Sequence, residues 1–231
     1  MKAALRWLGL VVAALVVVVV AVHAWYAATI WWWSSRPIVA TSFMDHRADE
    51  LRARTPQAQL KYEWVDYDRI SPHLKRAIIA AEDAKFVDHE GFDWQGIQRA
   101  LEKNERKGRV VAGGSTITQQ LAKNLFLTPT RSWTRKGQET VITLMLEAML
   151  TKRRIFEMYL NVIELGNGVF GAEAAARHYF NTSAAALTPT QAARLAAMAP
   201  NPRFYERNPG APGLARKIGI ISARMASADV P

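Results

Sequence analysis

The chain has 231 residues, a formal net charge of +10 and no cysteine. The length suits one anchored domain better than two, and the lack of cysteine excludes disulfide bonds and thiolate zinc sites. The basic excess favours anionic partners, which include nucleic acid, anionic lipid headgroups and pyrophosphates, and charge alone does not choose among them.

The chain begins with a long uncharged apolar segment. No Asp, Glu, Lys or Arg occurs from Trp7 to Ser35. A bilayer core about 30 Å thick needs roughly 20 apolar residues in a helix, so this segment is long enough to span it. Lys2 and Arg6 precede the segment, which predicts a cytoplasmic N-terminus. We predict a retained single-pass anchor in the cytoplasmic (inner) membrane. The alternative is a cleaved signal peptide, and both place the remainder in the periplasm or outside the cell.

The pattern predicts two parts, an anchor with its cytoplasmic tip at 1–36 and one extracytoplasmic domain at 37–231. Residues 37–70 are typical of a linker, with a short strand around 60–65. From Ser71-Pro72 onward the signals are helical. Helices are predicted from Ser71, at 94–107, from 115 or 116 to 125, and at 132–152, 154–164, 172–179, 188–198 and 214–225. A turn is predicted at Gly166, Gly168 and Gly171, and the helix at 188–198 is expected to end before Pro200, Pro202, Pro209 and Pro212. Strand-type alternation is nearly absent, so the domain is predicted to be mainly α-helical.

Glu82 is the first candidate for chemistry. It lies eight residues after Leu74 and four after Ile78, so the three share one helical face. Burial on an apolar face would raise the pKa of its carboxyl, which suits a general base near neutral pH. The alternative, which spacing alone favours, is a partly exposed helix-end carboxylate that extends toward solvent or pairs with Lys85 or Lys75.

The second candidate is the segment that follows Gly113-Gly114. The glycines lead into a predicted helix, and free backbone N–H groups at a helix start favour an anion. Helical spacing separates a polar stripe from an apolar one: Thr116, Gln120 and Lys123 against Ile117, Leu121 and Leu125. The alternative is an ordinary amphipathic helix after a glycine turn, and the lysine comes too late for a nucleotide-binding phosphate loop.

The third candidate is Glu139, which shares a helical face with Ile142 and Leu146. Arg135 lies four residues before it. The simpler interpretation is a helical ion pair worth about 0.3–0.5 kcal/mol. The functional one is a second inward carboxylate among cations, which together with Glu82 would suit glycosyl chemistry on a phosphorylated sugar.

The sequence of these segments resembles that of the family 51 glycosyltransferases, the peptidoglycan glycosyltransferases, over about residues 60–210. The matching segments, in order, are Glu82-Asp83-Ala84-Lys85-Phe86-Val87-Asp88-His89-Glu90-Gly91; Gly114 through Gln120 with Lys123-Asn124; Arg135-Lys136 with Glu139; Lys152 through Ile155 with Glu157, Tyr159, Leu160 and Asn161; and Gly168 through Gly171 with Ala175, Ala176, Tyr179 and Phe180. The sequence departs from the family at Asn181, where glycine is usual, and at Phe156, where leucine is commoner. It lacks the Ser-x-x-Lys and Lys-Thr-Gly motifs of penicillin-binding domains.

The resemblance implies a lysozyme-like helical fold and an inverting reaction. The acceptor, lipid II, attacks a lipid-linked glycan chain, a β-1,4 linkage forms and undecaprenyl pyrophosphate leaves. Glu82 and Glu139 are implied as catalytic, with Glu82 the general base and Glu139 near the leaving pyrophosphate, directly or through a divalent ion such as Mg²⁺ or Mn²⁺. The residues implied in substrate binding are Lys123, Arg131, Ser115, Gln119, Gln120, Asp83, Arg135 and Lys136. Phe86 and His89 are implied to shape the site around Glu82.

The implied partners are lipid II, the lipid-linked glycan, the membrane and proteins of cell division or wall synthesis. A nucleic-acid partner is not expected, because the export signal and the lack of a binding motif oppose it. Two other functions stay open at this point. One is a lysozyme-like enzyme that cleaves glycan, which would not need a cationic cradle for pyrophosphate. The other is a membrane-tethered scaffold, which would not need Glu82 and Glu139 together.

Overall fold

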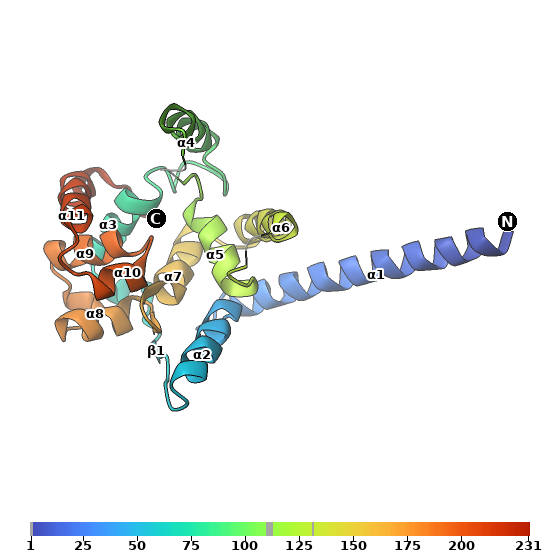
Figure 1. Ribbon diagram of the computed structural model, residues 1–231, viewed down its shortest axis with the longest axis horizontal. Helices are drawn as coiled ribbons and strands as arrows, with labels where there is room; N and C mark the ends of the chain where they lie inside the picture. The colour runs from blue at the N-terminus through green and yellow to red at the C-terminus, as the bar shows by residue number, and fades with distance from the viewer. Residues whose placement is uncertain (1, 110–112, 131) are drawn as a thin grey trace. The chain divides into compact units, whose positions relative to one another are not determined.

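The computed structural model describes residues 2–109, 113–130 and 132–231 (Figure 1). The chain forms two compact units, Met1–Pro37 and Ile38–Pro231. The first consists mainly of helix α1 (Lys2–Trp33). Its stretch Ala4–Trp33 has a mean hydropathy of 2.7 and is long and apolar enough to cross a membrane. This helix fits the predicted single-pass anchor, although a signal sequence has the same character.

The second unit is built almost entirely of helices, which confirms the prediction of a mainly α-helical domain. Its α-helices are α2 (Ser42–Arg54), α3 (Pro72–Glu82), α4 (Trp94–Lys107), α5 (Ile117–Phe126), α6 (Trp133–Met149), α7 (Lys152–Val162), α8 (Ala172–Phe180), α9 (Pro189–Met198), α10 (Pro202–Arg207) and α11 (Pro212–Arg224). Short 3-10 helices lie at Tyr67–Arg69, Ala184–Ala186 and Met225–Ser227. A small sheet has the order β1 (Lys61–Tyr62), β3 (Val169–Phe170), β2 (Glu164–Gly166), with β1 parallel and β2 antiparallel to β3.

Capping residues explain where the helices around the site begin. The Ser71 hydroxyl accepts from His73 N–H, and Pro72 occupies the first turn of α3. Thr116 and Gln119 form a reciprocal capping box at the start of α5. Helix α9 begins with the same device, so the starts that the sequence predicted for these helices are confirmed.

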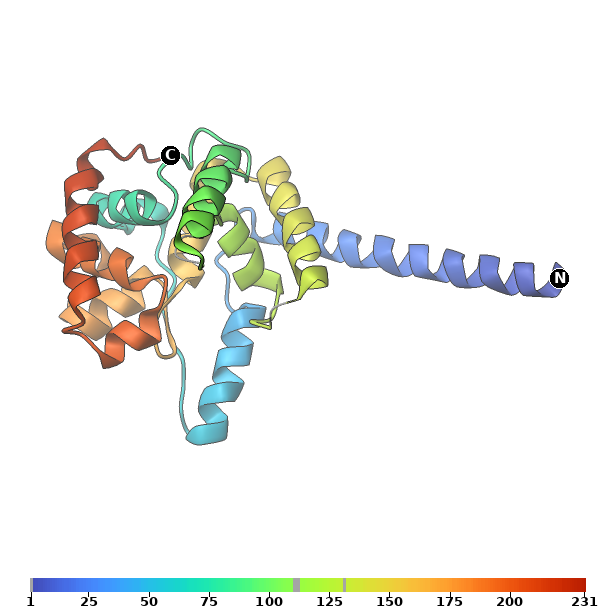
Figure 2. The ribbon, with the colours of Figure 1, turned by 45° about the horizontal axis from the view of Figure 1, so that its top comes forward.

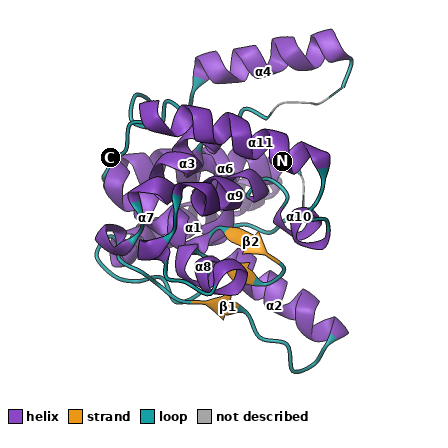
Figure 3. Cartoon of the chain, turned by 90° about the vertical axis from the view of Figure 1, so that its left-hand side faces the viewer, coloured by secondary structure: helices purple, strands orange, loops and turns teal. Residues whose placement is uncertain are grey.

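Two groups of packed helices hold the site. Helices α3, α9 and α11 pack together, and α5 packs against α2, α6 and α7 (Figures 1 and 2). The predicted apolar stripe of α5 is buried, since Ile117 and Leu121 are 0% exposed. The alanine-rich face of α9 lets α3 approach closely. Helix α4 lies at one edge of the domain (Figure 3), and of its described side chains only Ala100 is buried.

Three details of the predicted elements are wrong. The expected linker at 37–70 contains helix α2, whose buried residues are Phe43, Met44, Arg47 and Ala48. Because Arg47 is charged, the apolar face is too narrow to give a clear helical period. The helix predicted at 188–198 ends at Met198 as expected, but helix α10, which begins at Pro202 in a position that suits proline, was not predicted. The expected glycine turn at 166–171 also carries β2 and β3, which are too short to give an alternating pattern. The short strand expected around 60–65 is confirmed as β1.

Candidate active site

Glu82 is the last residue of α3 and faces the interior. Its Oε2 accepts a hydrogen bond from Gln120 Nε2 at 2.8 Å. Its Oε1 is buried and has no hydrogen-bond partner among the described residues. Burial raises the pKa of the Glu82 carboxyl, and the Gln120 hydrogen bond and the charges of Lys217 and Lys123 oppose that rise. Glu82 is therefore a desolvated carboxylate with one oxygen engaged and one left over.

The alternative in which Glu82 pairs with Lys75 or Lys85 is wrong. Lys75 Nζ lies over the Tyr67 ring, 3.9 Å from its centroid. Lys85 Nζ donates to Gln95 Oε1 at 2.8 Å. Both lysines are held elsewhere, so neither neutralises Glu82 by direct contact.

Asp83 joins the end of α3 to the start of α5. Its Oδ2 accepts the backbone N–H of Ile117 at 3.0 Å, which satisfies a free donor at the start of α5. His89 Nε2 lies 3.0 Å from Asp83 Oδ1. Phe86 is 0% exposed and packs edge-on against His89. Asp83, which we expected to bind substrate, thus has its carboxylate engaged by protein groups, and we interpret it as a positioning residue.

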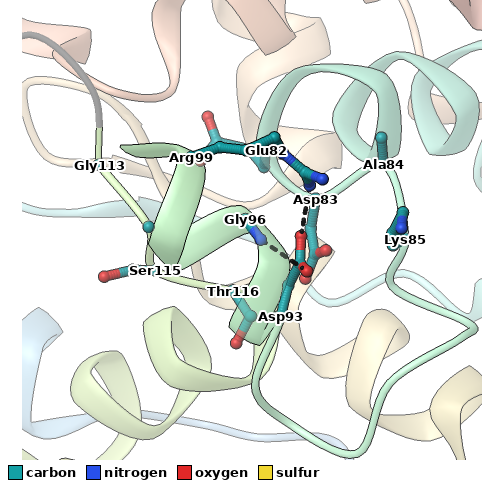
Figure 4. Close-up of a pocket in the computed structure, with 11 residues that line it drawn as sticks. Glu82, Asp83, Ala84, Lys85, Asp93, Gly96, Arg99, Gly113, Ser115 and Thr116 are labelled. Carbon is teal, nitrogen blue, oxygen red and sulfur yellow. Dashed lines mark hydrogen bonds and ion pairs between the residues drawn. The ribbon is translucent and has the colours of Figure 1, made fainter. Parts of the chain in front are cut away.

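A first cavity of about 200 Å³ opens beside Glu82 (Figure 4). Its charged lining residues are Glu82, Asp83, Lys85, Asp93 and Arg99, and Gly113, Ser115 and Thr116 close it from the side of α5. Asp93 accepts the Gly96 N–H at 2.8 Å and pairs with Arg99 at 3.4 Å. The free oxygen of Glu82 therefore belongs to a residue that lines a polar cavity large enough for part of a sugar.

A second, larger cavity of about 540 Å³ adjoins the first, and Gly113 and Ser115 line both. Its polar lining residues are Ser115, Gln119, Gln120, Lys123, Arg135, Lys136 and Glu139. Seven of the ten residues predicted for the site therefore line one cavity, and the other described ones, Glu82 and Asp83, line its neighbour. Arg131, the tenth, lies outside the described residues.

Glu139 sits on the buried face of α6, 4% exposed, as its spacing predicted. Its Oε2 accepts from Arg135 Nη1 at 3.0 Å and its Oε1 from Lys136 Nζ. The ion pair with Arg135 that the simpler interpretation predicted is present, and it lies inside the cavity rather than on an open surface. Glu139 thereby fixes two cations at the cavity wall.

Lys123 interacts electrostatically with both carboxylates, Glu139 and Glu82. Burial lowers the pKa of its ammonium group, and the negative charges of Glu139 and Glu82 act in the opposite sense. Lys123 lines the larger cavity. An anion bound there would meet Lys123 together with the cations that Glu139 holds.

The described residues do not fit a divalent ion held by protein ligands alone. They contain no group of three or more acidic or histidine side chains placed to bind a metal. Glu139, the residue predicted to lie near such an ion, already accepts from a cation on each of its oxygens. No step of the reaction is therefore assigned to a metal.

Sequence reasoning missed two groups that act on Glu82. Tyr159, known from the sequence only as part of a segment that matches the family, donates through its hydroxyl to Gln120 Oε1 at 3.1 Å. Lys217 on α11 acts on Glu82 through its charge. No local signal connects either residue with Glu82, because each contact depends on how distant helices pack.

A family model described as Transglycosylase matches residues 49–226. The chain therefore belongs to the transglycosylase family, whose members are glycosyltransferases, and the resemblance to family 51 and its lysozyme-like fold is confirmed. A protein of Dechloromonas aromatica (strain RCB), named biosynthetic peptidoglycan transglycosylase, is 73% identical over 191 residues, 83% of each chain. One of the same name from Aromatoleum aromaticum (strain DSM 19018 / LMG 30748 / EbN1) is 58% identical over 231 residues, all of both chains.

Proposed function

We propose that this membrane-anchored glycosyltransferase polymerises lipid II into β-1,4-linked glycan strands and releases undecaprenyl pyrophosphate. The observation that carries the proposal is the pairing of two cavities. One is lined by a buried carboxylate with a free oxygen, and the other by Lys123, Arg135 and Lys136. The first arrangement suits removal of a proton from a sugar hydroxyl, and the second suits an anionic leaving group.

In the proposed reaction Glu82 is the general base. Its carboxylate accepts the proton of the acceptor's GlcNAc 4-hydroxyl while that oxygen attacks the anomeric carbon of the donor's MurNAc. The bond between this carbon and the pyrophosphate oxygen breaks, and its electron pair leaves with the pyrophosphate. Attack from the opposite face turns an α-linked donor into a β-1,4 product. The burial that raises the pKa of Glu82 makes the carboxylate a better proton acceptor.

The leaving pyrophosphate is assigned to the larger cavity. Lys123 would contact its developing charge, and Arg131 is assigned to the same role from the family motif alone. Arg135 and Lys136 are oriented by Glu139, so that their positive charge is in place before the substrate enters. Such preorganised charge in a partly desolvated cavity stabilises the transition state more than mobile surface lysines would.

The proposed reaction takes place at the membrane surface, because both substrates carry lipid tails. Helix α1 supplies the anchor. Two tryptophans of the catalytic domain are strongly exposed, Trp94 at 71% and Trp133 at 93%. Tryptophan is favoured at the interface between lipid headgroups and hydrocarbon, and the basic surplus attracts anionic headgroups. We assign other wall-synthesis or cell-division proteins as partners only by family resemblance.

Incubation of the full chain with labelled lipid II, followed by sizing of the glycan, tests the proposal. We expect polymer from the wild type and a loss of about 10²–10⁴-fold in the Glu82→Gln variant. Parallel reactions with Mg²⁺, Mn²⁺ or a chelator show whether a divalent ion contributes. Degradation of finished sacculi without polymerisation would establish the cleaving enzyme instead. Inactivity on both substrates, with wall enzymes retained on the immobilised chain, would establish the scaffold.

A further inference from the structure

Glu82 is joined to a buried tyrosine through one intervening side chain. Gln120 Nε2 donates to Glu82 Oε2 at 2.8 Å, and Tyr159 Oη donates to Gln120 Oε1 at 3.1 Å. The three residues come from α3, α5 and α7, and α5 packs directly against α7. Tyr159 is 0% exposed. The carboxylate thus has a support that reaches into the core of the domain.

The chain of donors has one direction. An ionised carboxylate only accepts hydrogen bonds, so Gln120 must turn its NH₂ group toward Glu82 and its carbonyl oxygen toward Tyr159. That carbonyl requires a donor, which the phenol supplies as long as it is protonated. Burial raises the pKa of the Tyr159 hydroxyl well above its ordinary value, so the phenol remains a donor wherever the enzyme works.

The two oxygens of Glu82 consequently differ. Oε2 is occupied by Gln120, whereas Oε1 is buried and has no partner among the described residues. We propose that Tyr159 and Gln120 are positioning residues that hold the Glu82 carboxylate by Oε2, so that Oε1 is the atom that takes the proton from the acceptor hydroxyl. The inference rests on the proposed role of Glu82 as base. Gln120, which the resemblance implied to contact substrate, would then also position the Glu82 carboxylate.

The hydrogen bond from Gln120 restricts the Glu82 side chain to one rotamer before the acceptor binds. The hydrogen bond from Gln120 stabilises the ionised form, so its loss raises the pKa of Glu82 further. The other groups that act on this carboxylate are Lys217 on α11, Lys123 on α5 and Asp83 next in the chain. A variant that removes only the Tyr159 hydroxyl leaves all of these charges in place, so its effect reports on the donor chain.

The test compares Tyr159→Phe and Gln120→Leu with wild type, using the full chain in lipid II polymerisation over a range of pH. In both variants we expect the acid limb of the kcat profile to move to higher pH, more so in Gln120→Leu. In Tyr159→Phe we expect kcat to fall about two- to tenfold at its plateau, with KM unchanged. A matched control is Tyr67→Phe, which removes the hydroxyl of another buried tyrosine that donates to Pro231 O at 2.6 Å. Its profile should coincide with that of wild type.

A second readout is independent of turnover. Glutamate labelled with ¹³C at the carboxyl carbon allows titration of Glu82 by NMR, with the signal assigned by its loss in Glu82→Gln. The titration midpoint should rise in Gln120→Leu and Tyr159→Phe and stay in place in Tyr67→Phe. Unchanged midpoints and an unchanged acid limb would overturn the positioning inference while leaving polymerisation intact. Shifted midpoints in a protein that does not polymerise lipid II would instead refute the base role and the proposed function.

Discussion

Burial disfavours the charged form of the Glu82 carboxyl, and it also disfavours the charged form of a neighbouring lysine, Lys123. Burial penalises the ionised form of Glu82 and the protonated form of Lys123, so the pKa of the acid is raised and that of the lysine is lowered. Each group must be charged for the proposed reaction, one as proton acceptor and the other as anion ligand. The range of pH over which both are charged is therefore narrower than for free side chains.

This narrowing predicts a bell-shaped dependence of polymerisation rate on pH. The rate should rise as Glu82 loses its proton, above the ordinary carboxyl range, and fall as Lys123 loses its proton, below the ordinary lysine range. Arginine stays protonated across the accessible range, so Lys123→Arg should abolish the alkaline limb and leave the acid limb. Initial rates with labelled lipid II from pH 5 to 10 measure both limbs.

Lys75→Arg is the matched control for the alkaline limb. Burial also lowers the pKa of Lys75, but this lysine contacts the Tyr67 ring and lines neither cavity of the site. The control should keep the wild-type profile. An alkaline limb that survives in Lys123→Arg would remove Lys123 as its source.

The buried Glu82 carboxyl should lower the free energy of unfolding when it is ionised. Because the folded-state pKa of Glu82 is raised, its ionisation favours the unfolded chain. Below the unfolded pKa both states are protonated and there is no penalty. As pH rises through the unfolded and then the folded pKa, the penalty grows, and it is complete above the folded pKa. Glu82→Gln removes it, so the variant should be more stable than wild type at pH 7.

Thermal unfolding of both proteins in the same detergent, at pH 4 and pH 7, measures this difference. The two melting temperatures should nearly coincide at pH 4 and separate at pH 7, with the variant higher. A variant that melts lower than wild type at both values would mean that burial of Glu82 is offset by interactions that glutamine cannot make.

At the level of elements, α3 and α5 are fixed to one another at the place where the chemistry is proposed. Asp83 caps the first backbone donor of α5, and Thr116 Oγ1 donates to Gly91 O at 2.7 Å, so the loop after α3 is closed onto the start of α5. These bonds set the direction from which Gln120 reaches Glu82. The site therefore depends on helix ends as much as on the side chains that line it.

A single backbone position tests another helix end. Asn181 ends α8 with φ 50° and ψ 40°, in the left-handed region, and its N–H donates to Arg177 O at 3.1 Å. Asn181→Gly should keep or slightly increase stability, because glycine adopts this conformation freely. Asn181→Ala should lose about 1 kcal/mol. Urea denaturation of the full chain in detergent gives both values.

Asn208→Ala serves as the comparison, because Asn208 also ends a helix but has φ −130°. It should lose only the exposed side-chain hydrogen bond to Phe204 O. Equal losses in Asn181→Ala and Asn208→Ala would show that the left-handed backbone is not the source of the effect.

Helical spacing predicted the inward faces of α3, α5 and α6 and the burial of Glu139. For Glu82 spacing alone favoured a partly exposed helix-end carboxylate, and only the resemblance to the family favoured a catalytic role. The partners of Glu82 were not predictable in the same way. Gln120 lies 38 residues away in the chain and Tyr159 donates to Gln120 from 39 residues further on, so both contacts follow from packing between helices rather than from local pattern. Helix α2 escaped prediction because one of its four buried residues is charged: Arg47, which forms an ion pair with Glu164.

For the molecule as a whole, the apolar helix, the basic surplus and the cationic cavity each suit the proposed lipid-linked substrate. The apolar helix is followed by a domain that accounts for most of the excess of 30 basic over 20 acidic residues. A lipid-linked pyrophosphate offers an anion at the membrane surface, which is what a cationic cavity in an anchored domain is suited to meet. The proposed reaction requires that α1 stays attached and that the domain lies outside the cytoplasm.

Both requirements can be tested in one experiment, because the chain contains no cysteine and a single introduced thiol is the only reactive one. In intact cells whose outer layers are permeabilised, a membrane-impermeant maleimide should label Ser35→Cys and leave Ala4→Cys unlabelled until the membrane is dissolved. The opposite pattern would reverse the orientation predicted from Lys2 and Arg6. The purified chain should have the full mass of 25.8 kDa and stay in the membrane at alkaline pH. A shorter chain that begins near Trp25 would identify the apolar helix as a cleaved signal peptide.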